Sequence, residues 1–216
     1  MELGQYDIVM ETSALASMMV LPREGHLDAV FHMSAFLKRK HNGVIVFDPT
    51  EPEIDINKFP REDWSATTYG ECKEEIQSNA PEPRGIAFTM IEFVDSDHAG
   101  DMITRRSRTG FLIFLNNAPI YWFSRKQGSC ETSSFGSGFI AMKSCCEYVR
   151  GLRCKLRMLR IPVELPIYIF RDNQSVLVNS SNPHSSLKKK SSSIAFHFIR
   201  EGAAKDEWRF SYLNTN

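Results

Sequence analysis

The sequence predicts an α/β fold: a mixed five-stranded sheet with flanking helices, preceded by a small helical and connecting segment. Two observations predict it. After residue 84, three short apolar runs are separated by turn-rich connections, and a long amphipathic pattern follows them. Two further apolar runs then alternate with helical patterns up to the end of the chain, an order typical of α/β domains. With 216 residues, of which 42% are hydrophobic, the chain can bury one core and part of a second.

The elements of this sheet domain are expected in the following order. The first strand covers about Ile86–Val94, and the turn-forming segment 116–119 joins the second strand, Gly110–Leu115, to the third, Ile120–Phe123. A helix over 138–160 follows, because apolar residues recur at steps of three and four: Met142, Cys145, Val149, Leu152, Leu156 and Leu159. The remaining elements are a strand at Ile167–Phe170, a short helix through Val178, a helix at Ile194–Ala204 and a strand at Trp208–Leu213.

The first half of the chain has a different organisation. Helical patterns at Ile8–Val20 and His26–Lys40 precede a short apolar run, Gly43–Phe47, which predicts a strand. Residues 48–83 are acidic, contain prolines and show little periodicity, as a connector does. We therefore expect three parts: 1–47, an acidic connector at 48–83, and the sheet domain at 84–216.

Charge and cysteine content limit the function classes. The net charge is zero, so no global bias toward nucleic acid exists, although segments 143–160 and 188–209 are base-rich. The cations within 143–160 are expected to form a solvated helix face. Five cysteines without a Cys-x-x-Cys pair predict free thiols in a reducing compartment. We find no signal-peptide pattern and no apolar run near the ~20 residues that span a membrane, so we expect an intracellular protein, in cytoplasm or nucleus, that is not secreted.

Three motifs carry a family resemblance. Residues 93–101 contain Asp-Ser-Asp-His-Ala-Gly-Asp, residues 105–110 read Arg-Arg-Ser-Arg-Thr-Gly, and residues 119–127 run from Pro-Ile through Trp to Ser-Arg-Lys-Gln. Together they resemble the ribonuclease H domain of copia-type retrotransposon polyproteins. This resemblance implies a ribonuclease H-like fold for 84–216 and the remainder of a retroelement polyprotein as its context. Residues 1–47, with Pro-x-Glu-Gly-His between two helices, resemble a remnant of the reverse transcriptase thumb and connection, although an ordinary helical hairpin fits them equally well.

Carboxylates at strand ends are the candidate catalytic and metal-ligating residues. Asp95 follows the first apolar run and Asp172 follows the fourth, whereas Asp97 and Asp101 are expected to serve a turn. Hard cations require several carboxylate oxygens at one point. The resemblance implies hydrolysis of the RNA strand of an RNA–DNA hybrid with two Mg²⁺ (or Mn²⁺) ions about 3.5–4 Å apart. It assigns four carboxylates to that site, and Asp95 and Asp172 match two of them.

The sequence departs from the family pattern at the other two carboxylates. Segment 131–143 is similar to the family's Glu-Thr-Ser-x-Phe-Gly-Ala-Glu-Phe-x-Ala-Met, but its catalytic Glu falls on Gly138. Glu131 and Glu147 are too far along or around the helix to replace it. The fourth Asp would follow Asn216, so we expect a domain truncated at its C-terminus. The hypothesis is a degenerate, inactive copy; the alternatives are a non-catalytic RNA or hybrid-binding module and an inert retroelement fragment.

Several residues are candidates for contact with nucleic acid. The resemblance implies hybrid contacts at Trp122, Ser124 and Gln127, with Trp122 also a candidate core residue. A basic segment that the family carries before its last strand corresponds here to Lys188, Lys189, Lys190 and His197. The three lysines fit phosphate contact and a solvated loop equally well, and His197 fits product release or a plain helix-surface histidine.

Overall fold

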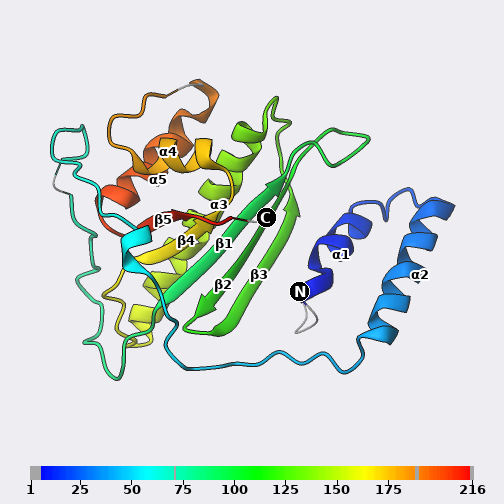
Figure 1. The fold of residues 1–216 in the computed structure, drawn as a ribbon, viewed down its shortest axis with the longest axis horizontal. Coiled ribbons are helices and arrows are strands. Elements are labelled where there is room, and N and C mark those ends of the chain that lie inside the picture. The colour runs from blue at the N-terminus through cyan, green and yellow to red at the C-terminus, as the bar shows by residue number, and fades with distance from the viewer. Residues whose placement is uncertain (1–5, 71, 188–189, 215–216) are drawn as a thin grey trace.

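A mixed sheet of five strands forms the centre of the computed structural model, which describes residues 6–70, 72–187 and 190–214 (Figure 1). Its strands lie in the order β3-β2-β1-β4-β5. The first three form an antiparallel meander, while β4 runs parallel to β1 and β5 runs parallel to β4. The bounds are β1 Met90–Asp97, β2 Arg108–Leu115, β3 Ala118–Lys126, β4 Ile167–Arg171 and β5 Trp208–Tyr212. The α/β class with five strands is therefore confirmed.

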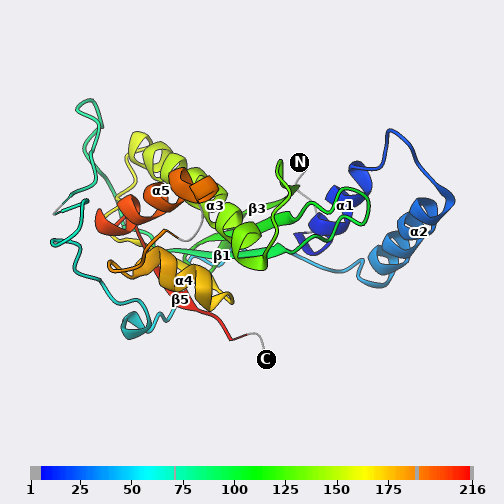
Figure 2. The ribbon, with the colours of Figure 1, turned by 90° about the horizontal axis from the view of Figure 1, so that it is seen from above.

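Three helices cover one face of this sheet (Figure 2). They are α3 Ser134–Met158, α4 Gln174–Ser181 and α5 Ser193–Ala204. The core lies between them and the sheet, and its fully buried members include Ile113, Met142, Val149, Ile167 and Trp208. Because strands alternate their side chains between two faces, every second residue of β1 and β4 points into this core.

Helix α3 begins earlier than predicted. The Ser133 hydroxyl accepts a hydrogen bond from the Gly136 N–H at 3.2 Å, which satisfies a donor that the first turn would leave unpaired. The predicted apolar stripe is confirmed at Val149 and Leu156, which are buried, and Leu152 packs against the core from its edge. For Leu159 the prediction was wrong: its side chain is 70% exposed, because the helix ends at Met158 before the stripe does.

Two strand predictions need correction. The first strand begins at Met90, not at Ile86, and continues to Asp97, so that Asp95 lies within β1 and not after it. The apolar run Gly43–Phe47 is not a strand at all. Its side chains at Val44 and Val46 are mostly exposed, and an apolar run without a neighbouring ladder gains little from extended structure.

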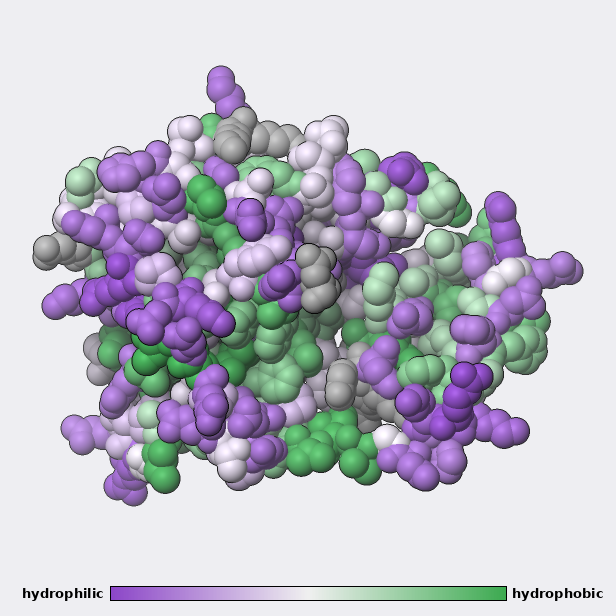
Figure 3. Space-filling view, in the orientation of Figure 1, coloured by the Kyte–Doolittle hydropathy of each residue, from purple (hydrophilic) through white to green (hydrophobic). Residues whose placement is uncertain are grey.

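The N-terminal segment packs on the edge of the sheet. Helix α1, Val9–Ala16, is shorter than predicted and lies against β3, where Ser13 Oγ donates to the carbonyl oxygen of Ser124 at 2.8 Å. Helix α2, Glu24–Arg39, packs against α1 and extends away from the sheet in both ribbon views (Figures 1 and 2). Figure 3 shows hydrophobic side chains over the α1–α2 region and across the middle of the face that is not covered by α3–α5.

Residues 48–83 have no regular element apart from a 3-10 turn at Ile56–Lys58, but they are docked on the sheet domain. Phe59 is buried edge-on between Tyr168 and Phe170, with ring centroids 4.8 and 5.0 Å away. Trp64 is buried as well, and the Arg200 guanidinium lies 4.8 Å from its ring centre. The segment therefore contributes to the core, while the domain boundaries at 47 and 83 stay a prediction.

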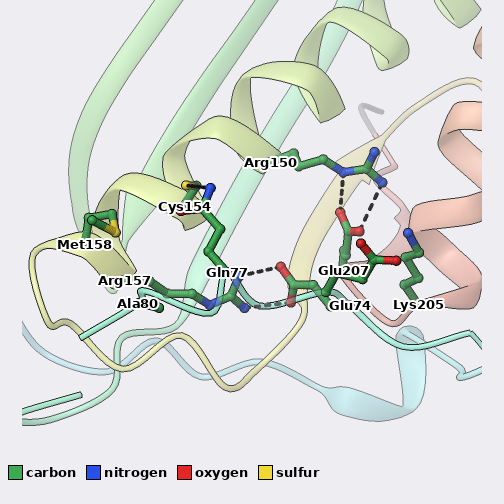
Figure 4. A pocket seen from close by; sticks show the side chains of 10 residues that line it. Glu74, Gln77, Ala80, Arg150, Cys154, Arg157, Met158, Lys205 and Glu207 are labelled. Carbon is green, nitrogen blue, oxygen red and sulfur yellow. Dashed lines mark hydrogen bonds and ion pairs between the residues drawn. The ribbon is translucent and has the colours of Figure 1, made fainter. Parts of the chain in front are cut away.

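The same segment makes ion pairs with α3 that correct the expectation of a solvated helix face. Glu74 receives two hydrogen bonds each from Arg153 and Arg157, and Arg153 is only 2% exposed. Figure 4 shows the Arg157–Glu74 pair beside a second pair, Arg150 with Glu207. Arg150, Arg153 and Arg157 therefore form ion pairs within the fold and do not belong to a solvated helix face.

The structure also describes the cysteines and the longest helices of the chain. All five cysteines are free. Within the described ranges, the longest and most apolar helices still fall short of what crossing a bilayer requires.

Candidate functional site

Asp95 and Asp172 lie side by side where two adjacent strands reach the same edge of the sheet. In the parallel pairing of β1 with β4, Phe93 stands opposite Phe170, so the residues two positions further on each strand are also level. Both aspartates line a cleft of about 520 Å³ together with Ser96, Asn173 and Tyr212. The Asn173 side chain caps α4 by accepting from the Val176 N–H at 3.1 Å. The sequence pattern thus brought the two carboxylates together; their role as metal ligands stays a prediction.

A buried guanidinium lies beside this pair. Arg171, the last residue of β4, points to the helix-covered face and is 2% exposed. Its Nη2 lies 3.5 Å from Ser96 Oγ, while Nε and Nη1 have no hydrogen-bond partner among the residues that the structure describes. Burial lowers the pKa of Arg171, and the charges of Asp95 and Asp172 oppose that shift. Arg171 also lines the cleft of Asp95 and Asp172, so the chain itself supplies a positive charge next to the two aspartates.

Gly138 lies directly against this guanidinium. A Cβ atom added at Gly138 would overlap Arg171 Nη2, and it would stand 3.1 Å from Arg171 Cζ and 3.2 Å from Val176 Cγ2. The helix position that the family resemblance gives to a Glu thus has no side chain, and any side chain there would require the Arg171 guanidinium to move.

The residues present do not fit a pair of hard cations. Two carboxylates lie at the strand ends, and no group of three or more His, Cys, Asp or Glu side chains able to hold a metal occurs within the described part of the chain. Neither neighbouring Glu compensates: Glu131 packs against Gly136 at the start of α3, and Glu147 forms an ion pair with Lys143 at 2.8 Å. A fixed positive charge at Arg171 also repels a cation placed between the aspartates.

The other two acidic residues of the motif hold the β1–β2 turn, as expected. Asp97 accepts a hydrogen bond from the Arg108 N–H. Asp101 accepts from the N–H groups of Ile103 and Thr104 and from Lys126 Nζ. These bonds hold the pKa of Asp101 well below its usual range.

The three residues predicted to contact a hybrid lie in different settings. Trp122 lines a largely apolar cleft of about 280 Å³ on the open face of the sheet, together with Asp95 and Asp172. Ser124 is buried under α1. Gln127 is buried too, and its Nε2 donates to Thr109 Oγ1 at 3.1 Å and to the Ser137 carbonyl at 2.9 Å. For Ser124 and Gln127 the expectation of surface contact is corrected: they join β3 to α1 and α3.

The basic segment before the last strand is only partly described. Lys188 and Lys189 lie outside the described residues, and Lys190 is exposed in a 3-10 turn. His197 lies on α5, and its Nδ1 is 2.7 Å from the Tyr69 hydroxyl of the docked segment. It lines none of the three clefts that contain Asp95 among the described residues. The described contacts of His197 are those of a helix-surface histidine, and a role in product release stays a prediction.

Sequence reasoning missed two buried ionisable residues, Arg171 and Glu92. Both occupy positions of their strands that alternate with outward-facing residues, so the period-two pattern of an otherwise apolar strand could have found them. Glu92 is fully buried, and no hydrogen bond within the described chain reaches either carboxylate oxygen. Burial raises the pKa of Glu92 to about 8, although the adjacent Cys145 thiol offsets part of the shift.

Comparison with known proteins identifies sequences similar to this chain. No protein family model matches the chain. It is 26% identical over 133 residues to the retrovirus-related Pol polyprotein from transposon RE1 of Arabidopsis thaliana, a match covering 62% of this chain and 9% of that protein. It is also 26% identical over 124 residues to the corresponding polyprotein from transposon TNT 1-94 of Nicotiana tabacum, covering 57% and 9%. The chain thus spans about a tenth of the length of these curated relatives.

Solved structures with a similar arrangement are ribonucleases H and reverse transcriptases. LC11-RNase H1 in complex with an RNA/DNA hybrid matches with a TM-score of 0.47 and 13% identity, over 59% of this chain and 86% of that one. The foamy viral protease-reverse transcriptase in complex with a hybrid matches with a TM-score of 0.40 and 13% identity, over 71% and 21%. The strand order β3-β2-β1-β4-β5 agrees with the mixed five-stranded sheet expected from the sequence. The expected resemblance to a retrotransposon Pol polyprotein is confirmed by the relatives.

Proposed function

We propose that this chain is a retrotransposon-derived ribonuclease H-like domain that has lost metal-dependent hydrolysis of RNA–DNA hybrids. One observation carries the proposal: Gly138 lies on α3 where a third carboxylate is needed, and the space in front of it is filled. Two-metal hydrolysis needs cations that activate water and stabilise the leaving oxygen. Two carboxylates offer too few oxygens to offset the mutual repulsion of two divalent ions.

A hydrolysis assay tests this proposal. The purified chain is incubated with a labelled RNA–DNA hybrid and Mg²⁺, and separately with Mn²⁺, beside the Asp95→Asn and Asp172→Asn variants. We expect no cleavage above the level of the two variants. Cleavage that requires the metal and disappears in Asp95→Asn would contradict the proposal.

Hybrid binding without hydrolysis is the second candidate function. Trp122 supports it, because this aromatic side chain lines a cleft next to Asp95, and aromatic rings beside a backbone-binding groove stack on nucleic-acid bases. Exposed cations, Arg125 on β3 and Lys190 before α5, are available for phosphate contact.

Salt-dependent affinity separates this candidate from an inert fragment. Fluorescence anisotropy with a labelled hybrid is measured at two salt concentrations, where phosphate contacts predict weaker binding at higher salt. Trp122→Ala should lower the affinity, whereas Phe31→Ala on α2, an exposed aromatic residue away from the site, should not. Binding that is absent, or equal in both variants and independent of salt, would favour the inert-fragment alternative.

A further inference from the structure

The carboxylate site contains an arrangement that the loss of one Glu does not explain. Losing a side chain at position 138 would leave a space beside the two aspartates. Instead, the Arg171 guanidinium lies in that space, in contact with the helix at Gly138 and closed from solvent. Gly138 and Arg171 are complementary in shape, because any Cβ at 138 requires the guanidinium to move.

We propose that Arg171 is the resident cation of this site: its guanidinium takes the place of a divalent metal beside Asp95 and Asp172, and Gly138 is the residue that makes room for it. The inference deepens the proposed function, since it assigns a cause to the lost metal requirement, and it rests on the same pair of aspartates.

Charge and burial both support this assignment. A buried guanidinium without a carboxylate partner is destabilising, and Nε and Nη1 of Arg171 have no partner within the described chain. Asp95 and Asp172 line the same cleft as Arg171, so their negative charges partly offset the positive charge of the guanidinium. In return the guanidinium reduces the repulsion between two aspartates on adjacent strands. The site is therefore already neutralised in part, and a divalent ion placed there would meet a fixed positive charge.

A double-mutant cycle tests the complementarity. Gly138→Ala is compared in the native chain and in Arg171→Leu, whose shorter side chain does not reach the helix. In the native chain we expect the unfolding equilibrium to shift toward the unfolded state by roughly tenfold or more, and in Arg171→Leu by much less. Gly151→Ala is the matched control, because Gly151 is in the same helix with nothing within 4 Å of an added Cβ. It should stabilise both backgrounds equally through helix propensity.

A metal titration tests whether the two aspartates hold a divalent ion beside the guanidinium. Binding of Mn²⁺ is measured by electron paramagnetic resonance in the native chain, Asp95→Asn and Asp172→Asn. We expect the same weak binding in all three. Mn²⁺ binding that is at least tenfold tighter in the native chain would overturn the inference, as would an equal cost of Gly138→Ala in both backgrounds. Hydrolysis and hybrid binding are separate readouts, so a failure of the proposed function is distinguishable from a failure here.

Discussion

Buried arginines lie at both ends of α3, but their hydrogen bonding differs: the arginine at the C-terminal end has close acceptors, and the arginine at the N-terminal end has few. At the C-terminal end, Arg153 is matched by Glu74 with bonds of 3.1 and 2.7 Å and donates a third, of 2.9 Å, to the Leu165 carbonyl. At the N-terminal end, Arg171 packs on Gly138, and its side chain makes one hydrogen bond within the described chain, of 3.5 Å to Ser96 Oγ.

Under the proposed function, the difference separates a structural ion pair from a degenerate catalytic site. Where stability alone decides, a buried guanidinium has carboxylate and carbonyl acceptors at hydrogen-bond distance. At the N-terminal end, the Arg171 guanidinium lies against Gly138, and its Nε and Nη1 have no hydrogen-bond acceptor among the described residues. Such local mismatches are expected at functional or once-functional sites.

The largest loss of stability is expected from removing the carboxylate that pairs with the arginines at the C-terminal end of α3. Glu74→Ala leaves Arg153 buried without its carboxylate and should cost about 3–5 kcal/mol of unfolding free energy, measured by chemical denaturation. Glu75→Ala, the exposed neighbour, should change it by less than about 0.5 kcal/mol. Equal changes in the two variants would mean that the ion pairs of Glu74 with Arg153 and Arg157 do not contribute to the free energy of unfolding.

The pH dependence of Glu74 follows from the same contacts. Burial alone would raise its pKa, but the hydrogen bonds from Arg157 and Arg153 outweigh burial and lower it to about 2 from 4.5. Because the folded pKa is depressed, this stabilisation is present above pH 4.5 and is lost as the pH falls toward 2. Glu74→Ala should abolish that part of the acid sensitivity.

The apolar side chains near the C-terminal end of α3 differ in burial, so their substitution by Ala should cost different amounts of unfolding free energy. Leu156→Ala should cost about 2–5 kcal/mol, because its side chain is buried under the sheet. Leu152→Ala should cost less, and Leu159→Ala should be close to neutral because Leu159 is exposed. A large loss for Leu159→Ala would contradict the helix end at Met158, and denaturant midpoints are sufficient to rank the three.

A smaller effect is expected from the buried carboxyl of Glu92: it should make the free energy of unfolding depend on pH. Its folded pKa of about 8 exceeds 4.5, so its neutral form is favoured in the fold. The associated stability is complete below pH 4.5 and is lost as the pH rises toward 8, with a slope of up to about 1.4 kcal/mol per pH unit. Glu92→Gln should remove this slope. If stability between pH 5 and 8 is equally flat in both proteins, Glu92 is not buried as a neutral acid.

The sequence was sufficient for the sheet and for the aspartate pair, because both depend on local patterns. Period-two alternation marks strands, and a carboxylate near the end of each of two adjacent strands must lie at one edge. The Arg171–Gly138 contact was not predictable in this way, since it joins a strand and a helix far apart in the chain. Phe59 and Trp64 gave no signal either, because isolated aromatic residues in an aperiodic segment do not indicate what they pack against.

The most direct test of the central claim is whether the guanidinium and a metal exclude each other. Mn²⁺ affinity is compared between Gly138→Glu alone and Gly138→Glu combined with Arg171→Leu, each with and without Asp95→Asn. The account predicts that the single variant gains no site, because Arg171 occupies the space, and that the combined variant gains a site that Asp95→Asn abolishes. Equally tight, Asp95-dependent binding by Gly138→Glu alone would contradict the account.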